Sequence, residues 1–383
     1  MAAEQGYPDA QARMGYYYQV GNGVPKDYEK SLEYLMLAAE QGNVAAMFFV
    51  GVAYEHGFGV TPDWRMAYQY YQLAADQGYP AAQCNVGYCY EKGITVKQDY
   101  AKAAEYYHLA AENGDATAQS NLGYFYEKGM GVKQDFQKAV ELYQLAADRG
   151  NARAQNNLGY CYRKGIGVKQ NYQKAIELYR LAAEQGDSLA QLNLGYCYQL
   201  GLGVACNAKE AARLYQLSAD QGRASAQYNL ALCYDNGNGV PQDYGKAVEY
   251  YELAIAQGDG EAMCNLGNLY YFGRGVTKDW EKAAEYYRMS AEKGVPNGFN
   301  NLAECYRDGE GVPQDYAEAV RLFVQAAERG NDESMLTLGK LYRDGEGVEQ
   351  NDELAEHYYR MAAERGNEKA QAALEALAKG ENL

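Results

Sequence analysis

The chain has 383 residues, 48% of them hydrophobic, and a net charge of −16 at pH 7. The hydrophobic content is enough to bury a core, which excludes wholesale disorder. The negative charge argues against nucleic-acid binding, which needs a clustered basic surface, and no apolar run approaches the roughly 20 residues that span a bilayer.

A glycine recurs every 36 residues along the chain, from Gly6 to Gly366, with no insertion. This period predicts ten tandem repeats over residues 7–366. We number the positions of each repeat from 1 to 36. The leading residues 1–6, "MAAEQG", match the last turn of a preceding repeat's second helix. Because repeat arrays normally begin with a polar cap, we expect either a fragment of a longer array or a chain that associates end to end through this uncapped repeat.

Each repeat is predicted to form two helices. Asn or Asp at position 1 suits the N-cap of the first helix, and apolar residues follow at positions 4, 8, 11 and 12. Glycine at position 15 ends that helix in the left-handed conformation. Asp or Asn fills position 21 in all ten repeats and caps the second helix, which closes at the glycine of position 36. After the tenth repeat, the alanine-rich residues 367–383 are predicted to form a C-terminal capping helix.

The glycines at positions 15 and 17 form a Gly-x-Gly that resembles a phosphate-binding loop. Such a loop must follow a strand and open a helix. Here the pair follows a predicted helix and recurs in nine of ten repeats, with Thr95 replacing the second glycine in the third. We therefore interpret it as a structural turn.

The frame "A-x-x-x-LG-x-x-Y-x-x-G-x-GV-x-x-D-x-x-KA-x-x-x-Y-x-x-AA-x-x-G", present from Ala118 to Gly150, resembles the Sel-one-like repeat, a branch of the tetratricopeptide superfamily. The resemblance covers essentially the whole chain. It implies an all-α, right-handed superhelical solenoid of antiparallel helix pairs, with first helices lining the concave face. It also implies a scaffold or adaptor that binds proteins, with no catalytic residues and no cofactor.

On the first helix, positions 3, 6, 7, 10, 13 and 14 share one side and are predicted to face the groove. Position 7 is asparagine in seven consecutive repeats. An amide can bond both groups of an extended peptide backbone, but it can equally bond a neighbouring helix and set the stacking. The candidate peptide-binding residues of this row are Asn85, Asn121, Asn157, Asn193 and Asn229.

Position 10 carries a tyrosine in repeats three to six, and cations lie nearby in the sequence. Tyr and Arg are enriched at binding hot spots. The position changes to Leu232, Asn268, Glu304 and Lys340 in later repeats, which a core position should not tolerate, whereas the invariant tyrosine of position 12 is assigned to packing. The candidates are Tyr88, Tyr124, Tyr160, Tyr196, Arg153, Arg163 and Lys164.

The later repeats and the cysteines favour less specific roles. The charged groove residues Arg307, Asp308, Arg343 and Asp344 are predicted to form local ion pairs on a solvated face. Five of the eight cysteines occupy position 11, where stacked helices lie too far apart for disulfides. We expect unpaired thiols in a reducing compartment, which favours the cytoplasm. The three histidines fall at different repeat positions, which argues against a metal site.

The leading function hypothesis is a non-enzymatic scaffold that binds a protein or peptide segment in its groove. A structural, self-assembling array is the second hypothesis, because the repeats are near-identical and the N-terminal cap is missing. A glycan-binding or cell-wall-associated accessory protein is the third, because aromatic-lined grooves can stack on sugars.

Overall fold

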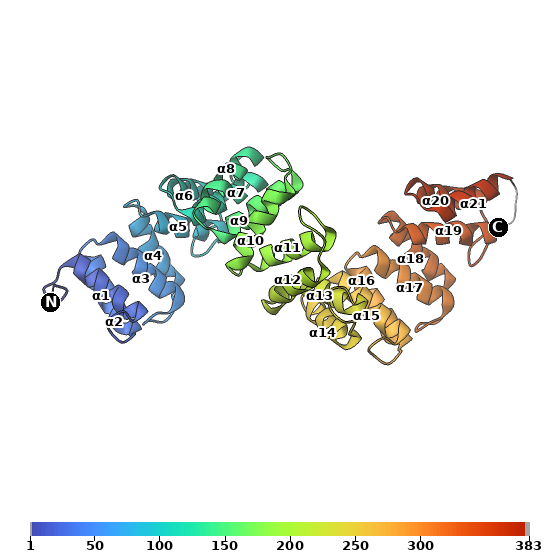
Figure 1. The fold of residues 1–383 in the computed structure, drawn as a ribbon, viewed down its shortest axis with the longest axis horizontal. Coiled ribbons are helices and arrows are strands. Elements are labelled where there is room, and N and C mark those ends of the chain that lie inside the picture. The colour runs from blue at the N-terminus through green and yellow to red at the C-terminus, as the bar shows by residue number, and fades with distance from the viewer. Residues whose placement is uncertain (1, 380–383) are drawn as a thin grey trace. The chain divides into compact units, whose positions relative to one another are not determined.

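The structure is a computed structural model that describes residues 2–379. In this part of the chain the backbone forms 21 α-helices and no strand, which confirms the all-α prediction. The helices alternate between the first and the second helix of each repeat, and neighbours in the chain pack against each other from α1 to α10 and from α12 to α21 (Figure 1). The described residues therefore form a helical solenoid.

The helices are nearly uniform in length, because the repeat has no insertions. The first helices are α1 (Pro8–Val20), α3 (Val44–His56), α5 (Pro80–Lys92), α7 (Ala116–Lys128), α9 (Ala152–Lys164), α11 (Ser188–Leu200), α13 (Ala224–Asn236), α15 (Gly260–Phe272), α17 (Pro296–Asp308) and α19 (Asp332–Asp344). The second helices are α2 (Tyr28–Glu40), α4 (Trp64–Ala75), α6 (Tyr100–Glu112), α8 (Phe136–Asp148), α10 (Tyr172–Glu184), α12 (Ala208–Asp220), α14 (Tyr244–Ile255), α16 (Trp280–Glu292), α18 (Tyr316–Glu328) and α20 (Asp352–Glu364). A last helix, α21 (Glu368–Lys379), follows.

The chain divides into two compact units, one ending at Ala190 and the other beginning at Gln191, so that α11 contains the boundary. Each unit is described by itself below. The division into a leading remnant (1–6), ten repeats (7–366) and a capping helix (367–383) stays a prediction. Residue 1 of that remnant and residues 380–383 of that cap lie outside the described residues.

Helix ends follow the predicted caps. The Asp27 side chain accepts a hydrogen bond from the Lys30 N–H at the start of α2, and the Asp or Asn at position 21 does the same in the other nine repeats. At the start of first helices, Asn43 and Asp115 cap in this way. Where position 1 is Tyr79 or Val295, the side chain makes no capping bond, and a proline follows as the first helical residue. Proline needs no partner there, because it has no N–H.

The two loop glycines have different tasks. The glycine of position 15 ends the first helix in the left-handed conformation, as Gly165 does with φ of 73°. The glycine of position 17 also has a positive φ and lies against the preceding repeat. A Cβ on Gly131 would stand 2.2 Å from the carbonyl oxygen of Tyr100, so glycine is what allows this approach at Gly131. Thr95, which replaces it in the third repeat, adopts a φ of 62°.

The core lies between the two helices of each repeat and around a large side chain at position 29. The ring of this residue is fully buried in eight repeats, as in Tyr143 and Tyr251. The glycine at position 9 of the first helix provides the space, since a Cβ on Gly123 would lie 2.8 Å from ring atoms of Tyr143. Eight of the ten repeats therefore centre on a tyrosine that packs against the facing helix, while Leu35 and Phe323 take its place in repeats one and nine.

The invariant tyrosine of position 12 is half-buried and packs outside that core. Its ring stacks on the tyrosine of position 28 where one is present, as Tyr90 does on Tyr106 at 5.8 Å between centroids. The lysine of position 24 lies over the same ring, as with Lys102 Nζ at 5.3 Å from the Tyr90 centroid. These contacts confirm the assignment of position 12 to packing.

Candidate functional site

The candidate site in the first unit lies on α5, α7 and α9. Consecutive first helices contact each other directly, α5 with α7 in the first unit and α15 with α17 in the second. Such contacts place first helices on the inner side of the stack. We use "first-helix face" for the side chains at positions 3, 7, 10, 13 and 14 of the first helices in either unit.

Each tyrosine of position 10 on α5, α7 and α9 is accompanied by a cation. The Tyr88 ring is 40% exposed, with Lys92 Nζ 5.8 Å from its centroid. On the next helix, Lys128 Nζ lies 5.6 Å from the Tyr124 centroid. Ammonium groups at these distances are attracted by the ring face.

Repeat five adds three further cations. The Arg153 guanidinium lies 5.8 Å from the Tyr124 centroid, and that of Arg163 lies 5.2 Å from the Tyr160 centroid. Lys164 is exposed at the end of α9. The structure thus brings most of the predicted tyrosines and all of the predicted cations together on α5, α7 and α9. Tyr196 lies on α11 in the second unit and is 40% exposed.

The buried core tyrosines reach this face through position 13, which sequence analysis missed as a partner. Tyr107 Oη donates to a Glu91 carboxylate oxygen at 2.7 Å, and the same carboxylate forms an ion pair with Lys92 at 2.7 Å. Tyr143 and Glu127 repeat the pattern on α8 and α7 at 2.9 Å. Burial raises the pKa of both phenols, so the hydroxyls stay protonated donors.

The signal for this pairing is present in the sequence at a spacing of 16 residues. Repeat five has Arg163 at position 13, and its Nε lies 3.3 Å from the Tyr179 hydroxyl oxygen. In repeat nine the position-29 residue is Phe323, which has no hydroxyl, and position 13 is Arg307. A carboxylate or amide at position 13 accompanies a tyrosine at position 29 in five of the ten repeats, namely two, three, four, six and seven.

The asparagine row is tied to its neighbours in several repeats. Asn121 is 8% exposed, and its Oδ1 accepts from Arg153 Nη1 at 3.1 Å. Asn157 accepts from Asn156 Nδ2 at 3.3 Å. Asn85 is half-buried on α5. The contact across repeats at Asn121 supports the stacking interpretation for that residue, and peptide binding by the row stays a prediction.

In the second unit the row continues on α11 and α13 with Asn193 and Asn229, both half-buried. Further on, Asn301 Nδ2 donates to Asn268 Oδ1 at 3.0 Å. Asn268 also accepts from Tyr287 Oη at 2.7 Å. Here positions 7 and 10 bond each other and the core, so their polar atoms are used within the protein.

The charged residues of the later repeats form the ion pairs predicted for them. Arg307 pairs with Asp308 at 2.7 Å, and Arg343 pairs with Asp344 at 2.7 Å. Adjacent residues pair in both cases, and all four side chains retain solvent exposure. Such pairs contribute little to stability.

Position 6 differs from its prediction as a groove position. It is mostly buried between repeats, as with Ser120, Asn156 and Asn300, each about 2% exposed. Position 6 faces the following repeat, as the hydrogen bond from Ser334 Oγ to Asn300 Oδ1 shows, so it belongs to the stacking surface rather than to the groove.

The cysteines are all free thiols. Cys206 is exposed, and the other seven are buried. Burial raises the pKa of the Cys161 thiol to about 12 and that of Cys233 to about 11, which keeps them protonated and unreactive. Within residues 2–379, no group of three or more His, Cys, Asp or Glu side chains is placed to hold a metal ion.

None of the described helices is both long and apolar enough to cross a membrane.

Comparison with known proteins identifies the repeats. The family model described as "Sel1 repeat" matches residues 8–43, 44–79, 80–115, 116–151, 152–187, 188–222, 224–259, 260–295, 300–331 and 332–367. No curated protein matches the chain. Among solved structures, a protective antigen of uropathogenic Escherichia coli with an SLR fold has 32% identity and a TM-score of 0.65, over 100% of this chain and 90% of that one. A Sel1 repeat protein from Oxalobacter formigenes has 35% identity and a TM-score of 0.61, over 64% of this chain and 96% of that one.

Proposed function

Because the chain belongs to the Sel1 repeat family, whose fold is generally a protein-interaction scaffold, we propose that it is a non-catalytic adaptor that holds a protein segment along its first helices. In the first unit the proposed contact residues are Tyr88, Tyr124, Tyr160, Arg153, Arg163, Lys164, Asn85, Asn121 and Asn157. Tyr196, Asn193 and Asn229 are further candidates in the second unit.

The observation that carries the proposal is the row of tyrosine rings on α5, α7 and α9, each with a cation within 6 Å of its centroid. A ring and a cation side by side offer flat apolar area and positive charge to one ligand. Tyr and Arg are the types that dominate binding energy when a partner covers them. The packing of the repeats does not require exposed rings, because position 10 changes freely in the second unit.

The charge of this face indicates the character of the segment. On α5, α7 and α9 this face carries five cationic side chains, whereas two carboxylates, Glu91 and Glu127, lie among them and already accept from buried tyrosines. The rest of the protein is strongly acidic, with a net charge of −16. An acidic segment is therefore attracted to this face and repelled by the remaining surface.

A library of acidic peptides tests the proposal on the full chain. We expect a subset to bind the parent and to lose at least tenfold in affinity to the variant Tyr88→Ser, Tyr124→Ser, Tyr160→Ser. The matched control, Leu73→Ser, Leu109→Ser, Leu145→Ser, removes three leucines that are 44% to 50% exposed on second helices. It should stay within twofold of the parent. Equal losses in both variants would contradict a site on the first-helix face.

Asparagine variants separate the two interpretations of the row. Asn157→Ala should weaken peptide binding with little change in thermal unfolding if the amide binds a peptide backbone. If the amides only set the stacking, Asn121→Ala lowers the unfolding temperature and leaves the affinity of the folded protein unchanged. A reducing compartment, in which all eight thiols stay free, remains part of the proposal.

Self-association is tested separately by light scattering over a range of concentrations. A monomer at high concentration would exclude end-to-end assembly.

A further inference from the structure

An aromatic residue at position 22, the first residue of the second helix, connects successive repeats. The Tyr28 ring stacks on Phe58 of the next repeat with centroids 4.7 Å apart. Tyr100 meets Phe125 of the next repeat at 6.1 Å. Eight of the nine repeats that precede another repeat have Tyr, Trp or Phe here. The ring therefore fills the space between one second helix and the positions 11 and 16 that follow.

A glutamine two residues earlier, at position 20, completes the arrangement. Gln98 Nε2 donates to the Tyr100 hydroxyl oxygen at 3.0 Å, and Gln242 does so to Tyr244 at 2.9 Å. The same glutamine amide donates to the carbonyl of position 13, as Gln98 does to Glu91 at 2.8 Å. The ring is thus held on its polar edge as well as on its faces.

The junction between repeats six and seven lacks both side chains. Ala208 stands at position 22 and Cys206 at position 20. The thiol keeps the glutamine's bond to the carbonyl of position 13, since Cys206 Sγ lies 3.2 Å from the Gln199 carbonyl oxygen. It has no amide to offer to a phenol.

The backbone spacing at this junction is unchanged, so the missing ring leaves a hole. A Cβ on Gly239 would stand 2.0 Å from the Ala208 carbonyl oxygen, and at an equivalent junction a Cβ on Gly311 would stand 2.0 Å from that of Trp280. The repeats therefore do not close over the lost side chain.

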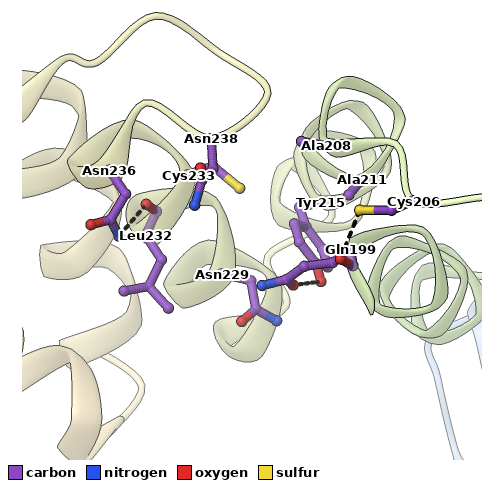
Figure 2. Close-up of a pocket in the computed structure, with 10 residues that line it drawn as sticks. All are labelled: Gln199, Cys206, Ala208, Ala211, Tyr215, Asn229, Leu232, Cys233, Asn236 and Asn238. Carbon is purple, nitrogen blue, oxygen red and sulfur yellow. Dashed lines mark hydrogen bonds between the residues drawn. The ribbon is translucent and has the colours of Figure 1, made fainter. Parts of the chain in front are cut away.

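The result is a cavity of about 260 Å³ within the second unit (Figure 2). An engineered apolar cavity of about 150 Å³ already binds benzene. The figure shows α13 and its following loop on one side, and α11, α12 and their connecting loop on the other. The lining residues are Gln199, Cys206, Ala208, Ala211, Tyr215, Asn229, Leu232, Cys233, Asn236 and Asn238.

The lining combines apolar walls with amide groups. Gln199 already accepts from Tyr215 Oη at 2.5 Å, and Asn236 donates to the Leu232 carbonyl at 3.0 Å. Asn229 and Asn238 make no side-chain hydrogen bond within the described residues, so their amides are free for a ligand hydroxyl. An amide both donates and accepts, which suits a phenol.

We propose that this cavity binds a tyrosine side chain of the partner segment, in place of the ring that Ala208 does not supply. Asn229, Leu232 and Asn236 occupy positions 7, 10 and 14, so the cavity opens among the residues of the first-helix face. That the ring belongs to a tyrosine of a protein segment rests on the proposed function. That the cavity binds a phenol does not depend on the proposed function.

The test uses p-cresol, the side-chain analogue of tyrosine, with the full chain. We expect one saturable site of millimolar affinity by calorimetry. Cys206 reports on the site, because it is the exposed cysteine beside the cavity. Saturating p-cresol should slow its alkylation by iodoacetamide at least fivefold.

Ala208→Tyr restores the ring that the other junctions have. This variant should fold with an unfolding temperature equal to or above that of the parent, bind no p-cresol, and show an alkylation rate that p-cresol does not change. In the opposite direction, Tyr100→Ala removes the ring at an equivalent junction of the first unit and should add a second p-cresol site. The proposal is wrong if p-cresol fails to bind the parent, or binds Ala208→Tyr equally well.

Peptides then test the source of the ring. Acidic peptides that bind the parent should lose at least fivefold in affinity when their tyrosine is changed to alanine, and the same amount when the protein carries Ala208→Tyr. If p-cresol binds but no tyrosine peptide does, the cavity takes small phenols and the protein-segment part is overturned. If peptides bind with an affinity that neither change alters, the adaptor function stands and the cavity proposal fails.

Discussion

On α7 in the first unit, position 10 is Tyr124, with Lys128 and Arg153 beside its ring. On α15 in the second unit, the same position is Asn268, and its amide oxygen accepts from Tyr287 and Asn301. The two helices have the same length, the same C-terminal glycine turn and the same packing against a buried position-29 tyrosine. The difference shows that the repeat conserves its core and turns, while the side chains of the first-helix face are set repeat by repeat.

The largest expected effect tests whether the core is equivalent in the two units. Tyr143→Ala in the first and Tyr251→Ala in the second each remove a ring that is 0% exposed. We expect each to lower the free energy of unfolding by about 3–5 kcal/mol, because the cavity cannot close around the facing helix. Urea unfolding followed by circular dichroism measures this. Tyr124→Ala on the first-helix face is the control and should lower the free energy of unfolding by about 1 kcal/mol or less. A difference above about 2 kcal/mol between the two core variants would show that the units are not equivalent.

The next effect concerns the turn where the first unit departs from the pattern. Thr95 holds a φ of 62°, whereas the equivalent residues of the second unit are all glycines with positive φ. Thr95→Gly should raise the free energy of unfolding by about 1 kcal/mol, because it relieves a conformation that β-branched residues avoid. Gly239→Ala should lower it by about 1–3 kcal/mol. Differential scanning calorimetry of both variants checks the opposite signs, and a loss of stability in Thr95→Gly would contradict this account.

A smaller effect distinguishes core hydroxyls with and without an acceptor. Tyr143→Phe leaves Glu127 without its buried donor and should lower the free energy of unfolding by about 1–2 kcal/mol. Tyr359 has a buried hydroxyl with no partner among the described residues. Tyr359→Phe should therefore be neutral or stabilising. Thermal unfolding of the two single variants, side by side, decides the matter; equal losses would mean that the Tyr143–Glu127 bond contributes nothing of its own.

The smallest effect depends on pH. Burial raises the pKa of Glu304, which occupies position 10 in repeat nine, above its ordinary value of 4.5. Between the ordinary pKa and the raised one the folded state binds more protons than the unfolded chain, so stability falls as pH rises through that window. Glu304→Gln should remove this pH dependence and raise the free energy of unfolding at pH 7 by about 1 kcal/mol or less. Unfolding temperatures between pH 4 and pH 7 measure it. An unchanged slope in the variant would assign the effect to other groups.

The helices, turns and caps could be predicted from the sequence because local chemistry determines them. Asp or Asn at position 21 accepts from backbone N–H groups within its own first turn, and the glycine of position 15 adopts a conformation other residues avoid. No partner elsewhere in the chain is needed to recognise either signal. The assignment of position 12 to packing also followed from its invariance.

Features that depend on the neighbouring repeat were harder to predict. Position 6 was expected in the groove, but the following repeat packs on it and buries it in most repeats. The pairing of Tyr107 with Glu91 joins residues on different helices, so the recurring 16-residue spacing becomes a signal only once the packing of the two helices is known. The cavity beside Cys206 could be seen only once the structure showed which space the position-22 ring fills in the other repeats.

The contact between the glycine of position 17 and the carbonyl of position 22 has a consequence for how such chains change over time. It is made by main-chain atoms, so it survives whichever side chain stands at position 22, as Gly239 and Ala208 demonstrate. A whole 36-residue unit can thus be duplicated, deleted or exchanged without designing a new junction. A single codon change at position 22 can then open or fill a binding pocket at any chosen point along the array.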